Sequence, residues 1–144
     1  MKNLGTAGYK LLTPGPLTTT ETVKEVMLFD HCTWDEDYKQ ITQRIRRELL
    51  QLAHVDETAY TTVLMQGSGT FGVESVISSV IPDDGCLLLL SNGAYGERIA
   101  AMCRYHHISC VHIAQDYDKI PDRMKAEEAL KQHPEITHIA MIHS

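Results

Sequence analysis

Apolar positions follow two different periods along the chain. From about Glu36 to His54 they recur every three to four residues, which predicts one long amphipathic helix (Ile41, Ile45, Leu49, Leu50, Ala53). Beyond residue 60, short apolar runs alternate with helical patterns. The runs predict strands near 62–66, 86–90, 109–113 and 137–142. The patterns between them predict helices near 70–80, 95–107 and 122–132.

The second of these runs, Cys86 to Leu90, is uniformly apolar. Such a strand is typical of a parallel sheet that helices cover on both faces. Strands that alternate with helices form βαβ units with right-handed crossovers. The predicted fold class is therefore α/β, with a mostly parallel sheet flanked by helices.

The N-terminal region has a different pattern. Residues 1–20 are predicted to be an extended arm, because Pro14 and Pro16 bias their predecessors away from helix. A short helix is expected from Thr20-Glu21 to about Leu28, with Thr20 as a candidate N-cap. These patterns predict an arm of residues 1–35 followed by an α/β region of residues 36–144.

A glycine-rich turn, Gln66-Gly67-Ser68-Gly69-Thr70, separates the first predicted strand from a helix. Glycines allow a ligand to approach the backbone closely, and a helix start offers unpaired N–H groups. Together with the hydroxyls of Ser68 and Thr70, they make a candidate cup for a phosphate. The alternative is a turn that only connects two elements.

Two common phosphate-binding motifs do not account for this turn. Gly67-x-Gly69-x-x-Gly72 matches the dinucleotide-binding glycine pattern, which also needs an acidic residue about 20 positions on, at the tip of the second strand. That strand leads instead into Ser91-Asn92-Gly93-Ala94-Tyr95-Gly96, with no carboxylate at its tip. A P-loop is excluded because no Gly-Lys-Ser/Thr follows the glycines.

This second turn carries an aromatic residue, Tyr95. In open α/β sheets the loops at the carboxyl ends of the strands converge on the ligand. A phosphate cup beside an exposed flat ring suits a phosphorylated aromatic cofactor such as pyridoxal phosphate, against which Tyr95 could stack. The alternative for Tyr95 is an aromatic packed under its loop.

Several stretches resemble the N-terminal part of the large domain of fold-type-I pyridoxal-phosphate aminotransferases. The Thr13-Pro14-Gly15-Pro16 and Asn92-Gly93-x-Tyr95-Gly96-x-Arg98 runs resemble the alanine–glyoxylate-type subgroup. The run Phe29-Asp30-x-Cys32-Thr33-Trp34-Asp35 is more specific, because it is similar to the 2-aminoethylphosphonate–pyruvate transaminases. The resemblance extends from residue 11 to the last residue.

The resemblance implies roles for individual residues. Ser68, Gly69 and Thr70 would hold the cofactor phosphate, and Tyr95 would stack on the pyridine ring. Thr13, Pro14, Gly15 and Pro16 would line the substrate entrance, although a rigid arm at a dimer contact is an equal alternative. Trp34 would border the same entrance or anchor packing. Arg98 is expected to be a structural residue at a helix start.

The resemblance also implies features that this chain does not contain. The family's Schiff-base lysine has no counterpart among the lysines present, and it would lie beyond Ser144. We therefore expect no catalytic residue within the chain, which we interpret as an inactive fragment of a homodimeric enzyme. The implied reaction moves the amino group of 2-aminoethylphosphonate to pyruvate, giving phosphonoacetaldehyde and alanine. The alternatives are an alanine–glyoxylate or serine–pyruvate aminotransferase, and a non-catalytic remnant.

Composition and charge restrict the kinds of partner and the location expected for this chain. A net charge of −6 argues against a nucleic-acid surface, and no apolar run approaches the ~20 residues of a membrane span. The start of the chain has no signal-peptide core, so we expect a cytoplasmic protein with reduced thiols. Cysteines and histidines cluster between Cys103 and His112, but helical and strand periods spread them apart, so no metal site is predicted.

Overall fold

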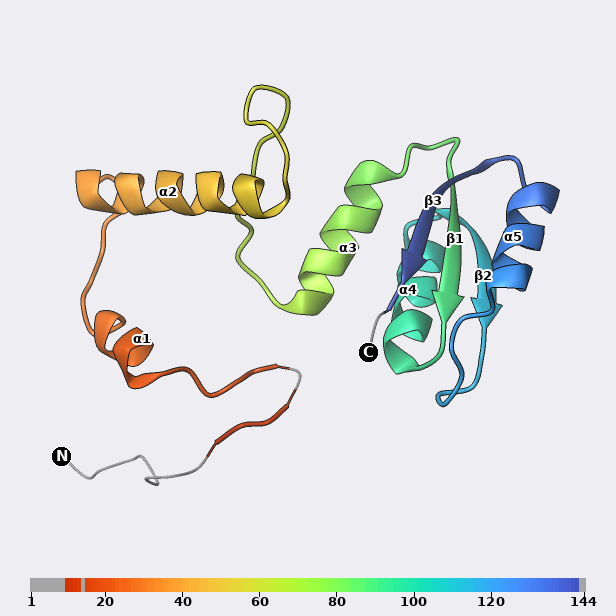
Figure 1. The fold of residues 1–144 in the computed structure, drawn as a ribbon, viewed down its shortest axis with the longest axis horizontal. Coiled ribbons are helices and arrows are strands. Elements are labelled where there is room, and N and C mark those ends of the chain that lie inside the picture. Colours follow the sequence, from red (N-terminus) through yellow and green to blue (C-terminus); the bar gives the residue numbers. More distant parts are fainter. Residues whose placement is uncertain (1–9, 14, 143–144) are drawn as a thin grey trace. The chain divides into compact units, whose positions relative to one another are not determined.

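The computed structural model describes residues 10–13 and 15–142. The chain divides into two compact units, residues 1–64 and 65–144, which are described separately below. The division predicted from the sequence, an arm of residues 1–35 before an α/β region, remains a prediction. Figure 1 shows the order of the helices and strands.

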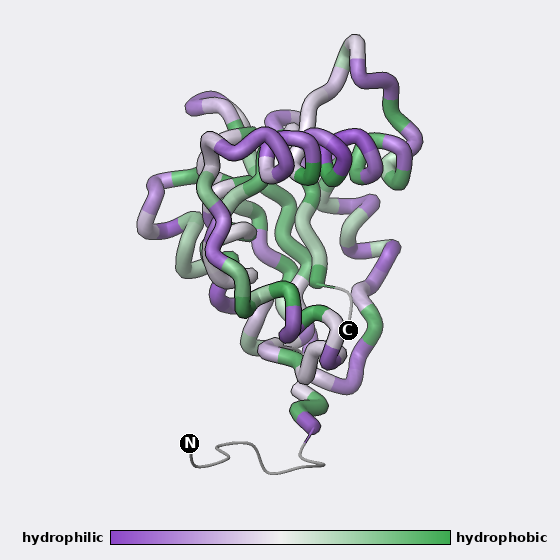
Figure 2. Tube along the Cα trace, turned by 90° about the vertical axis from the view of Figure 1, so that its left-hand side faces the viewer, coloured by the Kyte–Doolittle hydropathy of each residue, from purple (hydrophilic) through white to green (hydrophobic). Residues whose placement is uncertain are grey.

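The first unit contains two helices, α1 (Glu21–Val26) and α2 (Glu36–Leu52). α2 begins after Asp35 with two acidic residues in its first turn, where the helix dipole favours negative charge. Its apolar stripe of Ile41, Ile45 and Leu49 stays exposed, and apolar and polar positions alternate along the helix in Figure 2. No helix in the described ranges is both long and apolar enough to span a bilayer.

The strand predicted at 62–66 is wrong, because this segment has no strand structure. A strand needs a neighbour for its ladder of hydrogen bonds, and residues 61–62 bond instead to a side chain of α2. Arg46 Nε donates to the Thr62 carbonyl at 3.0 Å, and Arg46 Nη2 donates to Thr61 Oγ1 at 2.7 Å. Val63, Leu64 and Met65 then continue as exposed, irregular chain.

The second unit contains a parallel sheet, as predicted. Its strands are β1 (Cys86–Ser91), β2 (Ser109–Ala114) and β3 (Ile136–Met141), in the order β2-β1-β3 (Figure 1). β1 pairs with both neighbours, so that Leu88 lies beside Val111 on one side and Ile139 on the other. This central position buries Leu87, Leu88 and Leu89 almost completely, which is why β1 is apolar at successive positions.

Three helices accompany the sheet: α3 (Gly69–Val80), α4 (Ala94–Tyr105) and α5 (Arg123–Gln132). Leu87 and Leu89 form the core with Ile77 of α3 and with Ile99 and Cys103 of α4. The chain moves from β1 to β2 through α4 and returns across β1 to β3 through α5. Parallel connections of this kind are right-handed as a rule, and two that run in opposite directions across a sheet put their helices on opposite faces. The predicted α/β fold class is confirmed.

Candidate functional site

The start of α3 presents a set of hydrogen-bond donors. Ser68 is the N-cap, and its Oγ accepts a hydrogen bond from the Phe71 N–H at 3.2 Å. Gly69 and Thr70 occupy the first two helical positions, where N–H groups have no partner within the helix. Because Ser68 Oγ acts as an acceptor here, its proton stays available for donation. Two N–H groups and two hydroxyls thus gather where the helix dipole favours an anion.

The space around the glycines agrees with an anion site. A Cβ added to Gly69 would meet no atom within 4 Å, so the turn is open where a ligand would approach. Gly67 differs, since a Cβ there would lie 2.4 Å from Cδ1 of Phe71. An open turn lined by donors fits the phosphate group of pyridoxal phosphate.

The second glycine turn follows β1 and leads into α4, at the carboxyl edge of the parallel sheet. The Asn92 side chain donates to the Lys119 carbonyl at 3.0 Å, which fastens the turn to the loop after β2. A Cβ on Gly96 would lie 2.3 Å from Cβ and 3.0 Å from Cα of Ser91, so only glycine lets α4 start this close to β1. This packing presents Tyr95 with 56% of its surface exposed.

Arg98 connects the two turns. Its Nη1 donates to Thr70 Oγ1 at 2.9 Å, although 28 residues separate the two positions in sequence. Its guanidinium also lies over the Tyr95 ring, 5.7 Å from the ring centroid. From the sequence we expected only a structural role for Arg98. The available signal was its spacing, three residues after Tyr95, which places both side chains on one helix face.

Ser91, Glu97 and His112 form a second contact group that the sequence did not indicate. The buried Ser91 Oγ lies 2.7 Å from His112 Nε2 and 2.9 Å from Glu97 Oε1. His112 Nε2 is also 3.4 Å from Glu97 Oε1. One ring nitrogen therefore faces both partners, unlike a catalytic triad, in which the histidine joins its two partners through different nitrogens. The group joins β1, the first turn of α4 and β2.

The residues predicted for the substrate entrance lie in the first unit. Thr13 Oγ1 donates to the Pro16 carbonyl at 2.6 Å, which closes a tight turn that includes Gly15. Trp34 is exposed, with Lys39 Nζ 5.8 Å from its ring centroid. Pro14 lies outside the described residues. The structure therefore describes these side chains separately from Ser68, Thr70 and Tyr95, and their assignment to an entrance stays a prediction.

The cysteine–histidine cluster divides between α4 and β2. Burial raises the pKa of the Cys110 thiol to about 12 and also raises the pKa of the Cys103 thiol. Without a metal ion, these raised pKa values keep both thiols protonated at neutral pH. Within residues 10–13 and 15–142, no group of three or more metal-ligating side chains is found.

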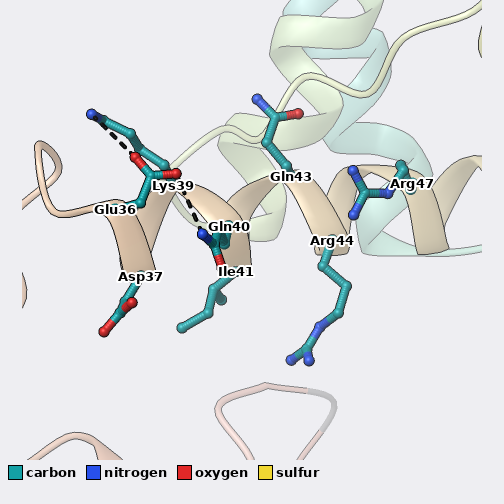
Figure 3. Close-up of a pocket in the computed structure, with 8 residues that line it drawn as sticks. All are labelled: Glu36, Asp37, Lys39, Gln40, Ile41, Gln43, Arg44 and Arg47. Carbon is teal, nitrogen blue, oxygen red and sulfur yellow. Dashed lines mark hydrogen bonds and ion pairs between the residues drawn. The ribbon is translucent and has the colours of Figure 1, made fainter.

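A hollow on the surface of α2 is distinct from this site. Among the described residues its lining comes from one helix, as Figure 3 shows: Glu36, Asp37, Lys39, Gln40, Ile41, Gln43, Arg44 and Arg47. Gln40 Nε2 donates to Glu36 Oε1 at 3.4 Å, and Lys39 Nζ lies 4.0 Å from Glu36 Oε2. Such contacts between residues three and four apart are those of a solvated helix surface.

Comparison with solved structures identifies the class of fold. The chain is similar to pyridoxamine–pyruvate aminotransferase from Mesorhizobium loti, with a TM-score of 0.75 and 22% sequence identity. The match covers 89% of this chain and 32% of that one. The fold is therefore that of part of an aminotransferase. No family model matches the chain.

Comparison with curated proteins is more specific than the comparison with solved structures. The chain is 53% identical over 137 residues to the 2-aminoethylphosphonate–pyruvate transaminase of Lysinibacillus sphaericus (strain C3-41). It is 56% identical over 136 residues to the enzyme of the same name from Bacillus thuringiensis (strain Al Hakam). These matches cover 95% and 94% of the chain but 37% of each relative. The chain is thus homologous to a segment of the 2-aminoethylphosphonate–pyruvate transaminases, which confirms the resemblance, and the coverage agrees with the prediction of a fragment.

Proposed function

We propose that this chain supplies the cofactor-phosphate cup and the ring-stacking aromatic of a pyridoxal-phosphate-dependent 2-aminoethylphosphonate–pyruvate transaminase. The observation that carries the proposal is the open, donor-lined start of α3 beside the exposed Tyr95, in a chain homologous to these enzymes. When bound, pyridoxal phosphate accepts the amino group of the donor and acts as an electron sink.

The proposed role of this chain's residues is to bind and orient the cofactor. Ser68, Gly69 and Thr70 direct two N–H groups and two hydroxyl protons at the phosphate, and each hydrogen bond to a charged group is strong. Tyr95 would stack on the pyridine ring and hold its orientation. Thr13, Pro14, Gly15, Pro16 and Trp34 belong to the proposal as the substrate entrance.

We propose that the proton-transferring lysine of these enzymes has no counterpart among the described lysines. The lysines of the described ranges are all exposed and lie outside both glycine turns: Lys10, Lys24, Lys39, Lys119, Lys125 and Lys131. We therefore propose that the 144-residue chain binds the cofactor weakly and without a covalent bond. Borohydride treatment should trap no stoichiometric adduct on one specific lysine, as mass spectrometry would detect.

The cup is tested by binding to the 144-residue chain. Pyridoxine 5′-phosphate is the probe, because it has no aldehyde and cannot form imines with surface lysines, and pyridoxine is its phosphate-free counterpart. Two-dimensional NMR titration measures affinities weak enough for a partial site. The wild-type chain should prefer the phosphorylated probe, and the double variant Ser68→Ala/Thr70→Ala should lose about tenfold to a hundredfold of that affinity.

Ser78→Ala serves as the control, because Ser78 Oγ donates to the Glu74 carbonyl on the exposed side of the same helix. It should leave both affinities unchanged. If the double variant binds the phosphorylated probe as well as the wild type does, the phosphate lies elsewhere.

The substrates are part of the same proposal. In the whole enzyme that contains this segment, 2-aminoethylphosphonate and pyruvate should give alanine, whereas alanine with glyoxylate or serine with pyruvate should react poorly. The reverse preference would favour the alanine–glyoxylate or serine–pyruvate type. We further propose a cytoplasmic homodimer, testable by cell fractionation and by sedimentation of the whole enzyme.

A further inference from the structure

We infer that Arg98 is a positioning residue of the phosphate cup, which it serves by directing the hydroxyl proton of Thr70 toward the anion. The inference rests on the proposed function, because it assigns a residue to the same cofactor site. Three features of the second unit carry it: the hydrogen-bonding roles of Thr70, the free charge of Arg98, and the contact of Arg98 with Tyr95.

The hydrogen-bonding roles follow from chemistry. A guanidinium is donor-only, so Thr70 Oγ1 accepts in its 2.9 Å contact with Arg98 Nη1. A threonine hydroxyl has one proton to donate, and this proton must then point away from Arg98. The open side of the turn is the side of Gly69, where an added Cβ would meet nothing within 4 Å. Arg98 thus prepares Thr70 as a donor before the anion arrives, which reduces the ordering cost of binding.

Among the described residues, no carboxylate neutralises the positive charge of Arg98. Among the described residues, the nearby carboxylates have other partners: Glu97 contacts Ser91 and His112, and Glu74 contacts His106 at 2.7 Å. No ion pair within the described ranges involves Arg98. A cation one hydrogen bond from the cup therefore adds a favourable field for a phosphate dianion.

Tyr95 is a second contact of the guanidinium. Arg98 lies three residues after Tyr95 on α4, and its guanidinium carbon lies over the Tyr95 ring, 5.7 Å from the ring centroid. A ring has two faces, so the face opposite Arg98 remains for a ligand. One side chain consequently couples the ring-stacking turn to the phosphate-binding turn.

The experiment measures pyridoxine 5′-phosphate and pyridoxine affinities of the 144-residue chain by NMR titration. Arg98→Met removes the donor and the charge while keeping the length, and it should weaken binding of the phosphorylated probe roughly threefold to tenfold. Arg98→Lys keeps a donor and a charge and should recover part of this loss. Arg104→Met, on the same helix beyond the site, is the control and should bind like the wild type.

A cycle with Thr70→Val tests the mechanism. If Arg98 acts through the Thr70 hydroxyl as well as by its charge, Arg98→Met should weaken binding clearly less in the Thr70→Val variant than in the wild-type chain. Equal losses in the wild-type chain and in the Thr70→Val variant would mean that Arg98 contacts the phosphate directly or acts only by charge, and would overturn the inference. Full binding by Arg98→Met would overturn it as well.

A measurement without ligand separates this inference from the cup itself. In the free chain, the arginine side-chain NMR signals should show hindered rotation for the Arg98 guanidinium and free rotation for that of Arg104. A freely rotating Arg98 guanidinium would overturn the inference whatever the chain binds. A hindered Arg98 in a chain with no preference for the phosphorylated probe would instead refute the proposed cup, and with it the role of Arg98 there.

Discussion

The two glycine turns of the second unit use the same residue for different purposes. At the start of α3, Gly69 faces open space, and the donors around it have room for a ligand. Before α4, a Cβ on Gly96 would overlap Ser91, and one on Gly93 would lie 3.1 Å from Cε1 of Tyr117. Glycine in the first turn keeps a site open, whereas glycine in the second lets a helix pack against a strand. A glycine motif therefore has no single meaning, and its surroundings determine whether stability or binding depends on it.

The largest effect should come from Gly96→Ala. The new Cβ would meet backbone and Cβ atoms of the buried Ser91, which cannot rotate away as the end of a long side chain could. Overpacking of this kind costs about 1–3 kcal/mol. Urea unfolding followed by circular dichroism should show the loss. Gly72→Ala, in α3 with nothing within 4 Å of the added Cβ, is the control and should be neutral or slightly stabilising. Equal stability of Gly96→Ala and wild type would remove the proposed difference between the turns.

Ser91→Ala should have the next largest effect, because it removes the hydroxyl that joins Glu97 and His112 at the second turn. We expect a loss of about 1 kcal/mol in the free energy of unfolding, since both partners are partly exposed and water can replace the lost bonds. Ser79→Ala, at an exposed position of α3, gives the baseline in the same urea experiment. A loss no larger than the baseline would mean that the group does not hold the turn together.

Gly69→Val should separate binding from stability. The side chain would extend into the open space of the first turn, so the free energy of unfolding should change by no more than about 0.5 kcal/mol. Affinity for pyridoxine 5′-phosphate should fall, because the methyl groups take the place of the phosphate. NMR titration of the variant measures its affinity for the probe, and urea unfolding measures its stability. Strong destabilisation would show that Gly69, like Gly96, is needed for packing.

The smallest effect should come from Gly67→Ala. The overlap of the new Cβ with Phe71 is large, but the Phe71 ring is 42% exposed and can turn aside. We expect a change in unfolding free energy below about 0.5 kcal/mol and retained probe affinity. Urea unfolding and the same titration measure both quantities. A loss as great as that of Gly96→Ala would mean that the Phe71 ring is held rigidly, and that both turns depend on tight packing.

Much of the fold follows from local pattern. The apolar run of β1 predicts a strand covered on both faces, and the amphipathic stripe of α2 predicts a helix within two residues of the observed one. Strand 62–66 was wrong for a tertiary reason: its residues have suitable side chains, but pairing needs a neighbouring strand, and Arg46 binds residues 61–62 instead. Apolar periodicity indicates which secondary structure a segment can adopt. It does not indicate whether a neighbouring strand is available for pairing.

The candidate site likewise combines features that follow from local sequence with features that depend on tertiary contacts. The sequence alone determined that hydroxyls and glycines open a helix at Ser68 to Thr70, and that an aromatic follows β1, because both depend on residues adjacent in the chain. Only the tertiary structure decided that Gly69 is open while Gly96 is packed, that Ser91 meets His112, and that Arg98 reaches Thr70. Those contacts join positions 5 to 28 residues apart, and they exist because parallel crossovers bring the carboxyl ends of strands and the starts of helices to one edge of the sheet.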